Sequence, residues 1–165
     1  MSNRLLKEYR ELRAARDPDI DLRLADESDV TAWIVRIRGP AGTPYEGGWF
    51  VLSMKCPQTY PLAPPKVRFE TPVFHPNVLF KTGEICLDIL KPDSWTPAWT
   101  LQSVCRAICA LLADPEADSP LNCDAGNLVR NGDMRGYRSM AKMYTQLHAE
   151  TRDDGASSSA DSSRR

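Results

Sequence analysis

The spacing of hydrophobic residues near the start of this 165-residue chain is helical. Over residues 3 to 15, Leu5, Tyr9 and Leu12 lie on one stripe, and Leu6 widens it. This stripe predicts a first helix with a basic outer face. That face consists of Arg4, Lys7, Arg10 and Arg13. Such a face is either plain solvated surface or a docking face for an acidic partner.

Between residues 20 and 69 the period changes to two, which is typical of strands with one buried face. Four short runs alternate in this way, and the links between them are too short for crossover helices. The sequence therefore predicts a four-stranded antiparallel meander with helices covering one face. The inward residues of the four runs are Ile20, Leu22 and Leu24; Trp33, Val35 and Ile37; Phe50, Leu52 and Met54; Val67 and Phe69.

The helical period returns after residue 100. A wide apolar stripe predicts a central buried helix from about 100 to 113, and Asn122 or Asp124 is placed to cap a short helix through Val129. A last helix follows, so the predicted fold class is α+β, with an N-terminal helix, the meander and about three further helices. The central stripe is Leu101, Val104, Cys105, Ile108, Leu111 and Leu112. The packed side of the last helix is Tyr137, Met140, Ala141, Tyr144 and either Leu147 or His148.

The composition fits one ordinary globular domain, with 42% hydrophobic and 26% charged residues. We place this domain at residues 1–150 and predict a disordered tail of Ser, Asp and Arg at 151–165. A net charge of −1 gives no general attraction to nucleic acid or anionic membranes. No apolar run approaches the roughly 20 residues of a membrane span, and no leader precedes the first helix, so we expect a cytosolic protein without direct membrane insertion.

The chain has five cysteines, an odd number that fits a reducing compartment. Cys105 and Cys109 share one face of the central helix, and we interpret both as core, with a disulfide to another cysteine left open. No Cys-x-x-Cys pair or neighbouring histidine completes a zinc set. The sequence therefore predicts neither a metal site nor a cofactor.

The segment His75–Asp88 has the composition of an active site. Its turn-forming residues make a plain helix or strand improbable, and they bring the Cys86 thiol near the Asn77 amide. A thiolate attacks a carbonyl or thioester carbon, and an amide N–H can stabilise an oxyanion. The sequence offers no evident imidazole base for Cys86, which favours thioester exchange over hydrolysis. On composition alone, Cys86 would be a small buried hydrophobe.

Three motifs, His75–Asn77, Gly83–Leu90 and Trp95–Thr100, resemble those of the ubiquitin-conjugating enzyme family, and the likeness extends from residue 4 to about 148. That family has a first helix, a four-stranded meander and further helices. The resemblance implies that Cys86 accepts the C-terminal glycine of ubiquitin from a ubiquitin-activating enzyme, in an ATP-dependent pathway. Cys86 then yields it to a substrate nucleophile.

The resemblance also assigns roles around Cys86. His75 would hold the turn, and Asn77 would steady either the oxyanion or the loop that carries it. Where many relatives have an acidic residue before Pro120, this chain has Ser119, preceded by Asp118. An acid there desolvates or deprotonates an attacking lysine, so the serine favours a cysteine acceptor unless Asp118 substitutes.

Partner surfaces follow from the same resemblance. The basic first helix, including Arg4 and Lys7, would meet the activating enzyme. Together with Leu62, Pro97 and Ala98 it would meet a RING-type ubiquitin ligase. Some relatives bind a second ubiquitin on the back of the sheet. There this chain carries a long charged side chain, Arg23, which argues against chain building through that surface.

Further stretches resemble the peroxisomal branch of the family: Phe80–Gly83, Trp99–Ile108, Ser119–Asp124 and Ser139–Tyr144. This likeness implies transfer of ubiquitin to the peroxisomal import receptor for its recycling, often on a cysteine. It also implies recruitment to the cytosolic face of the peroxisomal membrane by a small anchor protein. Two other functions stay open at this point, a non-catalytic adaptor with the same fold and a cysteine hydrolase that depends on His75.

Overall fold

The computed structural model describes residues 3–151, so the predicted tail, apart from Thr151, lies outside the described residues. The elements confirm the predicted fold class, a helix followed by four strands and three further α-helices. They are α1 (Asn3–Ala14), β1 (Ile20–Asp26), β2 (Asp29–Arg38), β3 (Trp49–Lys55), β4 (Lys66–Phe69), the short 3-10 helix η1 (Asp88–Leu90), α2 (Leu101–Ala113), α3 (Cys123–Arg130) and α4 (Met134–His148).

The sheet is an antiparallel meander in the order β1-β2-β3-β4. Its register places Leu22, Val35, Leu52 and Phe69 opposite one another in one row across all four strands. Val35 and Leu52 are fully buried there. The neighbouring row points to the other face and is Arg23, Ile34, Ser53 and Arg68. The alternation predicted from the sequence thus becomes one buried and one largely polar face.

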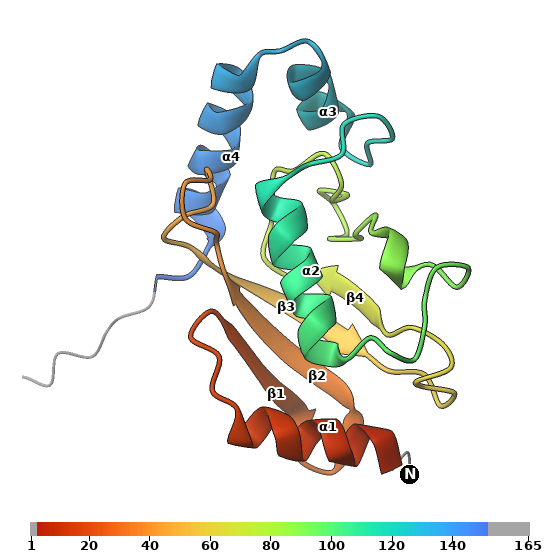
Figure 1. The fold of residues 1–165 in the computed structure, drawn as a ribbon. Coiled ribbons are helices and arrows are strands. Elements are labelled where there is room, and N and C mark those ends of the chain that lie inside the picture. The colour runs from red at the N-terminus through yellow and green to blue at the C-terminus, as the bar shows by residue number, and fades with distance from the viewer. Residues whose placement is uncertain (1–2, 152–165) are drawn as a thin grey trace, which may run out of the picture.

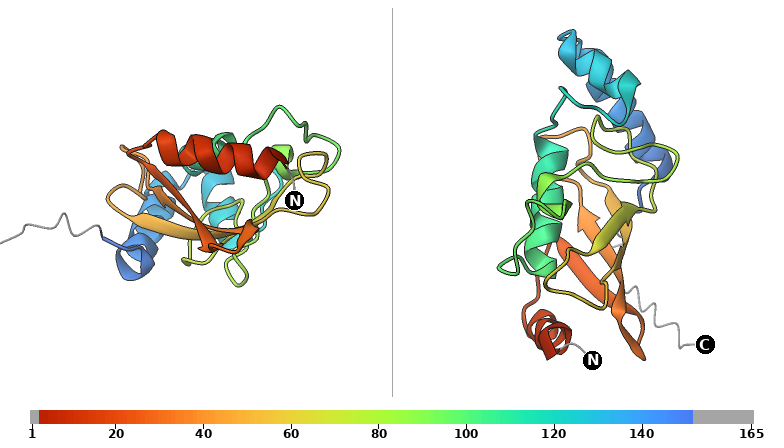
Figure 2. Two further views of the ribbon diagram at one scale, coloured as in Figure 1. Left: turned by 90° about the horizontal axis from the view of Figure 1, so that it is seen from below. Right: turned by 90° about the vertical axis from the view of Figure 1, so that its right-hand side faces the viewer.

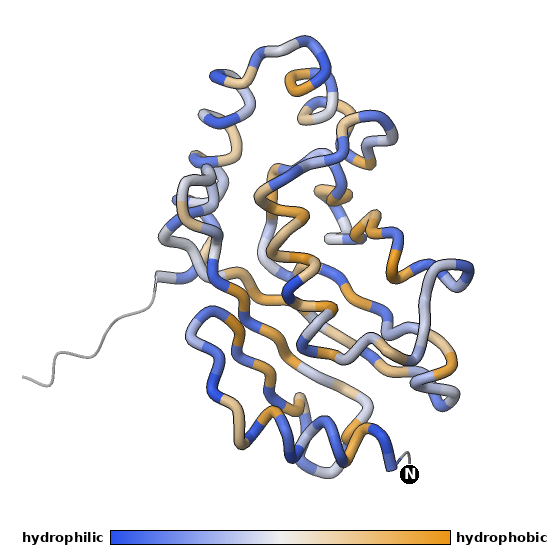
Figure 3. Tube along the Cα trace, in the orientation of Figure 1, coloured by the Kyte–Doolittle hydropathy of each residue, from blue (hydrophilic) through white to orange (hydrophobic). Residues whose placement is uncertain are grey.

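Helix α2 covers the buried face, and Figures 1 and 2 show it on one side of the sheet only. Thr100 and Ser103 form a capping box that satisfies backbone N–H groups at its start. In Figure 3 the hydrophobic colour runs along α2 and the middle of the strands beneath it. All six residues of the predicted apolar stripe are buried: Leu101, Val104, Cys105, Ile108, Leu111 and Leu112.

Helix α1 crosses the end of the sheet, as the view from below in Figure 2 shows. Leu5 is buried as predicted, and the ring of Tyr9 meets Trp33 edge to face with centroids 6.0 Å apart. Arg4 lies only partly on the predicted outer face: its side chain is 26% exposed, and its guanidinium contacts Glu8 and backbone carbonyls of a distant loop. Glu8 is itself only 3% exposed, because position 8 lies on the same face of the helix as Leu5 and Leu12.

Helices α3 and α4 continue beyond the sheet at the upper end of Figure 1. The hydroxyls of Tyr45 and Tyr137 are 2.7 Å apart and join α4 to the core. Both alternatives for the end of the packed side, Leu147 and His148, are exposed, and the buried residue there is Thr145. His148 stacks on the ring of Tyr144, with centroids 5.8 Å apart.

Candidate active site

Cys86 is half-buried, at the start of a non-helical stretch that leads into η1. Its backbone N–H donates to the carbonyl oxygen of Asn77 at 2.8 Å, and the preceding residue, Ile85, bridges to Val78. The two residues that the sequence placed together are therefore neighbours across a short antiparallel pairing. The thiol is not sealed in the core.

Three of the other four cysteines are less suited to nucleophilic chemistry, and all five cysteines are free. Burial raises the pKa of the Cys56 thiol to about 12 and that of Cys109 to about 11. Burial also raises the pKa of Cys105, which is fully buried. Thiols of this kind stay protonated near neutral pH. Cys123 is exposed at the first residue of α3 and serves as a comparison for Cys86.

Gly83 fixes the path of the chain into Cys86. Its φ is +74°, and a Cβ atom there would lie 1.8 Å from the carbonyl oxygen of Phe69. The amide of Phe69 donates to the carbonyl of Gly83 at 2.8 Å, so the segment is fastened to the end of β4. Only glycine allows both this backbone conformation and this close approach.

His75 holds the turn from inside the core, with no exposed surface. Its Nδ1 accepts from the amide of Asn77 at 3.0 Å, so Nε2 carries the proton and donates to the carbonyl of Leu111 at 2.8 Å. Burial lowers the pKa of His75 from 6.5 to about 4. A neutral imidazole with both nitrogens engaged is no base for Cys86, and the hydrolase hypothesis loses the residue on which it depended.

Asn77 fastens the segment to the loop after α2. Its side chain is 1% exposed, and its Nδ2 donates to the carbonyl of Glu116 at 2.7 Å. The amide of Glu116 in turn donates to Oδ1 of Asn77 at 2.8 Å. The carbonyl of Pro76 accepts from the amides of Leu121 and Asn122 at 2.8 and 3.0 Å. The loop 116–122 therefore folds back onto the Cys86 segment.

Asp118 and Ser119 lie in that fastened loop, and both are exposed. On the other side of the segment, Lys91 forms an ion pair with Asp88 at 2.7 Å, and this contact is the main reason that the pKa of Lys91 is raised. Sequence reasoning missed two members of this arrangement, Lys91 and Glu116. A lysine three residues after Asp88 was a visible signal for the first, whereas Glu116 acts through its backbone and leaves no sequence signal.

The residues assigned to partner binding differ in how exposed their side chains are. Leu62 is 79% exposed, Pro97 and Ala98 are also exposed, and Lys7 lies at the surface near Glu11. Arg4 is half-buried, and its Nη2 donates to the carbonyl oxygen of Pro97 at 2.9 Å. Arg4 therefore contacts the backbone of the loop that exposes Pro97 and Ala98.

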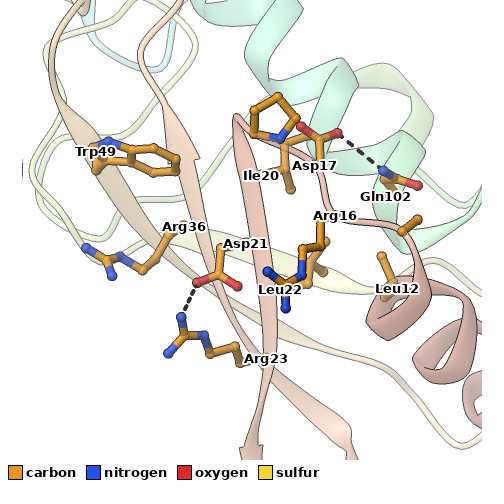
Figure 4. Close-up of a pocket in the computed structure, with 12 residues that line it drawn as sticks. Leu12, Arg16, Asp17, Ile20, Asp21, Leu22, Arg23, Arg36, Trp49 and Gln102 are labelled. Carbon is orange, nitrogen blue, oxygen red and sulfur yellow. Dashed lines mark hydrogen bonds and ion pairs between the residues drawn. The ribbon is translucent and has the colours of Figure 1, made fainter. Parts of the chain in front are cut away.

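A hollow of about 570 Å³ runs beside β1, and none of its lining residues belongs to the Cys86 segment. Figure 4 shows Arg23 and Asp21 pointing toward each other there, 2.8 Å apart. Arg23 is the long charged side chain noted on the back of the sheet, and its side chain is 72% exposed. Within residues 3–151, no group of three or more His, Cys, Asp or Glu side chains is placed to hold a metal ion.

Comparison with known proteins identifies the family. The family model for ubiquitin-conjugating enzymes matches residues 4–145. Protein PEROXIN-4 of Arabidopsis thaliana is 62% identical over 148 residues, which cover 88% of this chain and 93% of that protein. Ubiquitin-conjugating enzyme E2 pex4 of Dictyostelium discoideum is 58% identical over 148 residues, covering 90% of this chain and 99% of that protein.

A solved structure agrees with these relatives. H. polymorpha ubiquitin-conjugating enzyme Pex4p, crystallised in complex with the soluble domain of Pex22p, superposes with a TM-score of 0.83 at 38% identity. The match covers 88% of this chain and 96% of that one. None of the helices within residues 3–151 has the length and apolar character that crossing a membrane demands. Family model, relatives and fold agree: this chain belongs to the ubiquitin-conjugating enzymes.

Proposed function

We propose that this enzyme carries ubiquitin as a thioester on Cys86 and passes it, with a RING-type ligase, to a substrate. In the first step the Cys86 thiolate attacks the carbonyl carbon of the ubiquitin thioester on the activating enzyme, whose thiolate leaves. In the second step an acceptor nucleophile attacks the same carbonyl carbon. Cys86 leaves as the thiolate, and the acceptor gives up a proton. The observation that carries the proposal is the accessible Cys86, fastened to Asn77 and to the loop 116–122.

The environment of Cys86 supports transfer rather than hydrolysis. Hydrolysis requires a base that activates water, and His75 is buried with both ring nitrogens engaged. Transfer from a thioester needs no such base at Cys86, because a thiolate is already a good leaving group. The acceptor supplies the remaining chemistry, and the exposed pair Asp118 and Ser119 lies in the loop that is fastened to the Cys86 segment. A cysteine acceptor depends less than lysine on an acid in this loop, because its thiol is partly ionised near neutral pH.

The similarity to peroxin-4 proteins supports the peroxisomal membrane as the location of this activity. We infer that the enzyme is recruited to the cytosolic face of the peroxisomal membrane by an anchor protein of the Pex22p kind, since the soluble domain of Pex22p binds the H. polymorpha relative. The proposed substrate there is the peroxisomal import receptor, which would be modified for recycling. Purified protein should bind the soluble domain of such an anchor and, once charged, should modify the receptor.

The test of the carrier mechanism is a charging assay with activating enzyme, ATP and ubiquitin. Wild type should form an adduct that reducing agent cleaves, Cys86→Ala should form none, and Cys86→Ser should form an oxyester that survives reduction. Cys123→Ser is the matched control, because Cys123 is exposed and lies outside the segment. It should charge like wild type. If wild type takes up no ubiquitin yet still binds a ligase or anchor, the protein acts as an adaptor and the carrier mechanism is wrong.

A further inference from the structure

The carboxylate of Glu8 is buried at the point where α1 meets two loops and the start of α2. Its Oε1 accepts from Nε of Arg4 and from the hydroxyl of Tyr60, both at 2.6 Å. Its Oε2 accepts from the amide of Leu101, the first residue of α2, at 2.8 Å. A negative charge is favoured at a helix N-terminus, where amides lack partners within the helix. Three donors thus converge on one carboxylate that is 3% exposed.

These contacts hold together two loops that the sequence leaves far apart. Tyr60 precedes the loop that exposes Leu62, and Leu101 follows the loop that exposes Pro97 and Ala98. Arg4 adds hydrogen bonds from Nη2 to the carbonyls of Pro97 and Trp99, both at 2.9 Å. These two carbonyls flank Ala98. Glu8 and Arg4 therefore help to set the position of each loop relative to the other.

A second contact joins the loops directly. Nε1 of Trp95 donates to the carbonyl of Pro61 at 2.8 Å, and the rings of Trp95 and Tyr60 lie 6.1 Å apart. This contact limits how far the loops separate when the carboxylate is altered. It does not replace the carboxylate, because it reaches neither Arg4 nor the amide of Leu101. Loss of Glu8 should therefore shift the loops without unfolding them.

We propose that Glu8 is a positioning residue for the ligase step, which sets the spacing between Leu62 and the Pro97–Ala98 pair. This inference rests on the proposed function, in which a RING ligase binds that surface. Glu8 does not touch the ligase itself, because it is buried. It acts on ligase affinity through the backbone of the two loops. The Cys86 segment is held by separate contacts, those of His75 and Asn77.

The variant Glu8→Gln tests the proposal with almost no change in shape. A glutamine amide has one acceptor oxygen where the carboxylate has two, and its NH₂ group would face a donor, either the Leu101 amide or the Tyr60 hydroxyl and Arg4. Either the Leu101 amide or Arg4 then loses its acceptor, since the Tyr60 hydroxyl can turn and accept from the NH₂ group. Tyr60→Phe is the milder variant, since it removes only one of the three donors. Tyr137→Phe is the matched control, because it also removes one hydrogen bond of a buried tyrosine hydroxyl, the one to Tyr45.

The assay is discharge of charged enzyme at increasing concentrations of a RING domain, chosen because it accelerates discharge from wild type. Glu8→Gln should raise the apparent KM for the RING domain about tenfold while the rate at saturation stays within twofold of wild type. Tyr60→Phe should raise KM about threefold. Tyr137→Phe should lower the unfolding temperature and leave KM unchanged. A merely structural role for Glu8 predicts instead that KM follows thermal stability in all three variants, and that result would overturn the proposal.

Hydrogen exchange of the uncharged protein gives a readout that needs no ligase. Glu8→Gln should speed exchange at least tenfold at the amide of Leu101 and in residues 96–99, and leave residues 75–78 unchanged. Unchanged exchange in 96–101 also overturns the inference. The proposed function fails separately, if wild type takes up no ubiquitin. If wild type charges and responds to the RING domain while Glu8→Gln has the wild-type KM, only the positioning role of Glu8 is wrong.

Discussion

The Asn77 side chain could either donate directly to the oxyanion or hold the loop 116–122, and replacing Asn77 by alanine separates these two roles. The structure shows both ends of the Asn77 amide bonded to the backbone of Glu116, at 2.7 and 2.8 Å. Each such hydrogen bond contributes about 1 kcal/mol net. Glu116 is exposed, so water can satisfy its freed N–H and C=O groups. The expected loss is therefore about 2 kcal/mol, which for a domain of this size lowers the unfolding temperature by roughly 4–8 °C.

The rate of ubiquitin transfer should fall in Asn77→Ala because the loop carrying Asp118 and Ser119 loosens. Hydrogen exchange in residues 116–119 should accelerate in the same variant. If Asn77 instead donated directly to the oxyanion, the effects of Asn77→Ala on transfer rate, stability and exchange would differ. Removing such a donor lowers the rate about 100-fold or more, and it need not change stability or loop exchange. The Nδ2 of Asn77 already donates to Glu116, which favours the loop-holding role.

The control for this experiment is Asn122→Ala, at the other end of the same loop. Asn122 caps α3 through the amide of Ala125 at 3.1 Å, so its loss should cost about 1 kcal/mol without freeing Glu116. Urea unfolding, hydrogen exchange and single-turnover discharge to free lysine are measured on both variants. The loop-holding argument is refuted if Asn77→Ala keeps wild-type stability and wild-type exchange in 116–119 while its transfer rate collapses.

Three further results are expected. The free energy of unfolding should fall by about 2 kcal/mol between pH 7.5 and pH 5, because burial lowers the pKa of His75 to about 4 while the unfolded chain takes up this proton near pH 6.5. In urea unfolding, His75→Gln should lack this pH dependence. An equal pH dependence in the variant would contradict the lowered pKa of His75. Ser119→Asp should raise the ratio of lysine to cysteine discharge severalfold, measured on charged enzyme with each free amino acid, and an unchanged ratio would remove the role given to Ser119. Leu62→Ala should leave unfolding within about 0.5 kcal/mol of wild type, because the side chain is 79% exposed, yet weaken stimulation by a RING domain; equal stimulation would exclude Leu62 from the ligase surface.

The sheet and the central helix could be predicted because their residues repeat with the period of the element. Phe50, Leu52 and Met54 alternate in sequence and are buried in the structure, and the apolar stripe of α2 is buried along its whole length. A charged residue on a buried face is a different matter. Glu8 was assigned no role, since its burial depends on Tyr60 and on an amide 93 residues further along the chain. Local periodicity carries no information on such contacts.

Part of the site around Cys86 could also be predicted from the sequence, because the residues involved are close together in the chain. Cys86 and Asn77 are only nine residues apart, with turn formers between them, so the sequence itself brings them together. The partner of Asn77 is the backbone of Glu116, 39 residues away, and a backbone group has no residue identity to recognise. The tautomer of His75 could not be foreseen either, because the acceptor for its Nε2 is another carbonyl, that of Leu111.

Helix α2 connects these two networks, since each ties down one of its ends. Glu8 accepts from the first amide of the helix, that of Leu101, and His75 donates to the carbonyl of Leu111 in its last turn. Both groups lack partners within the helix, so each contact satisfies a helix terminus as well as a loop. The two ends are about 15 Å apart at 1.5 Å per residue. Because the contacts share no side chain, their effects on stability should add to within about 0.5 kcal/mol. The rigid helix would then keep the proposed ligase surface and the Cys86 segment in register, with no switch between them.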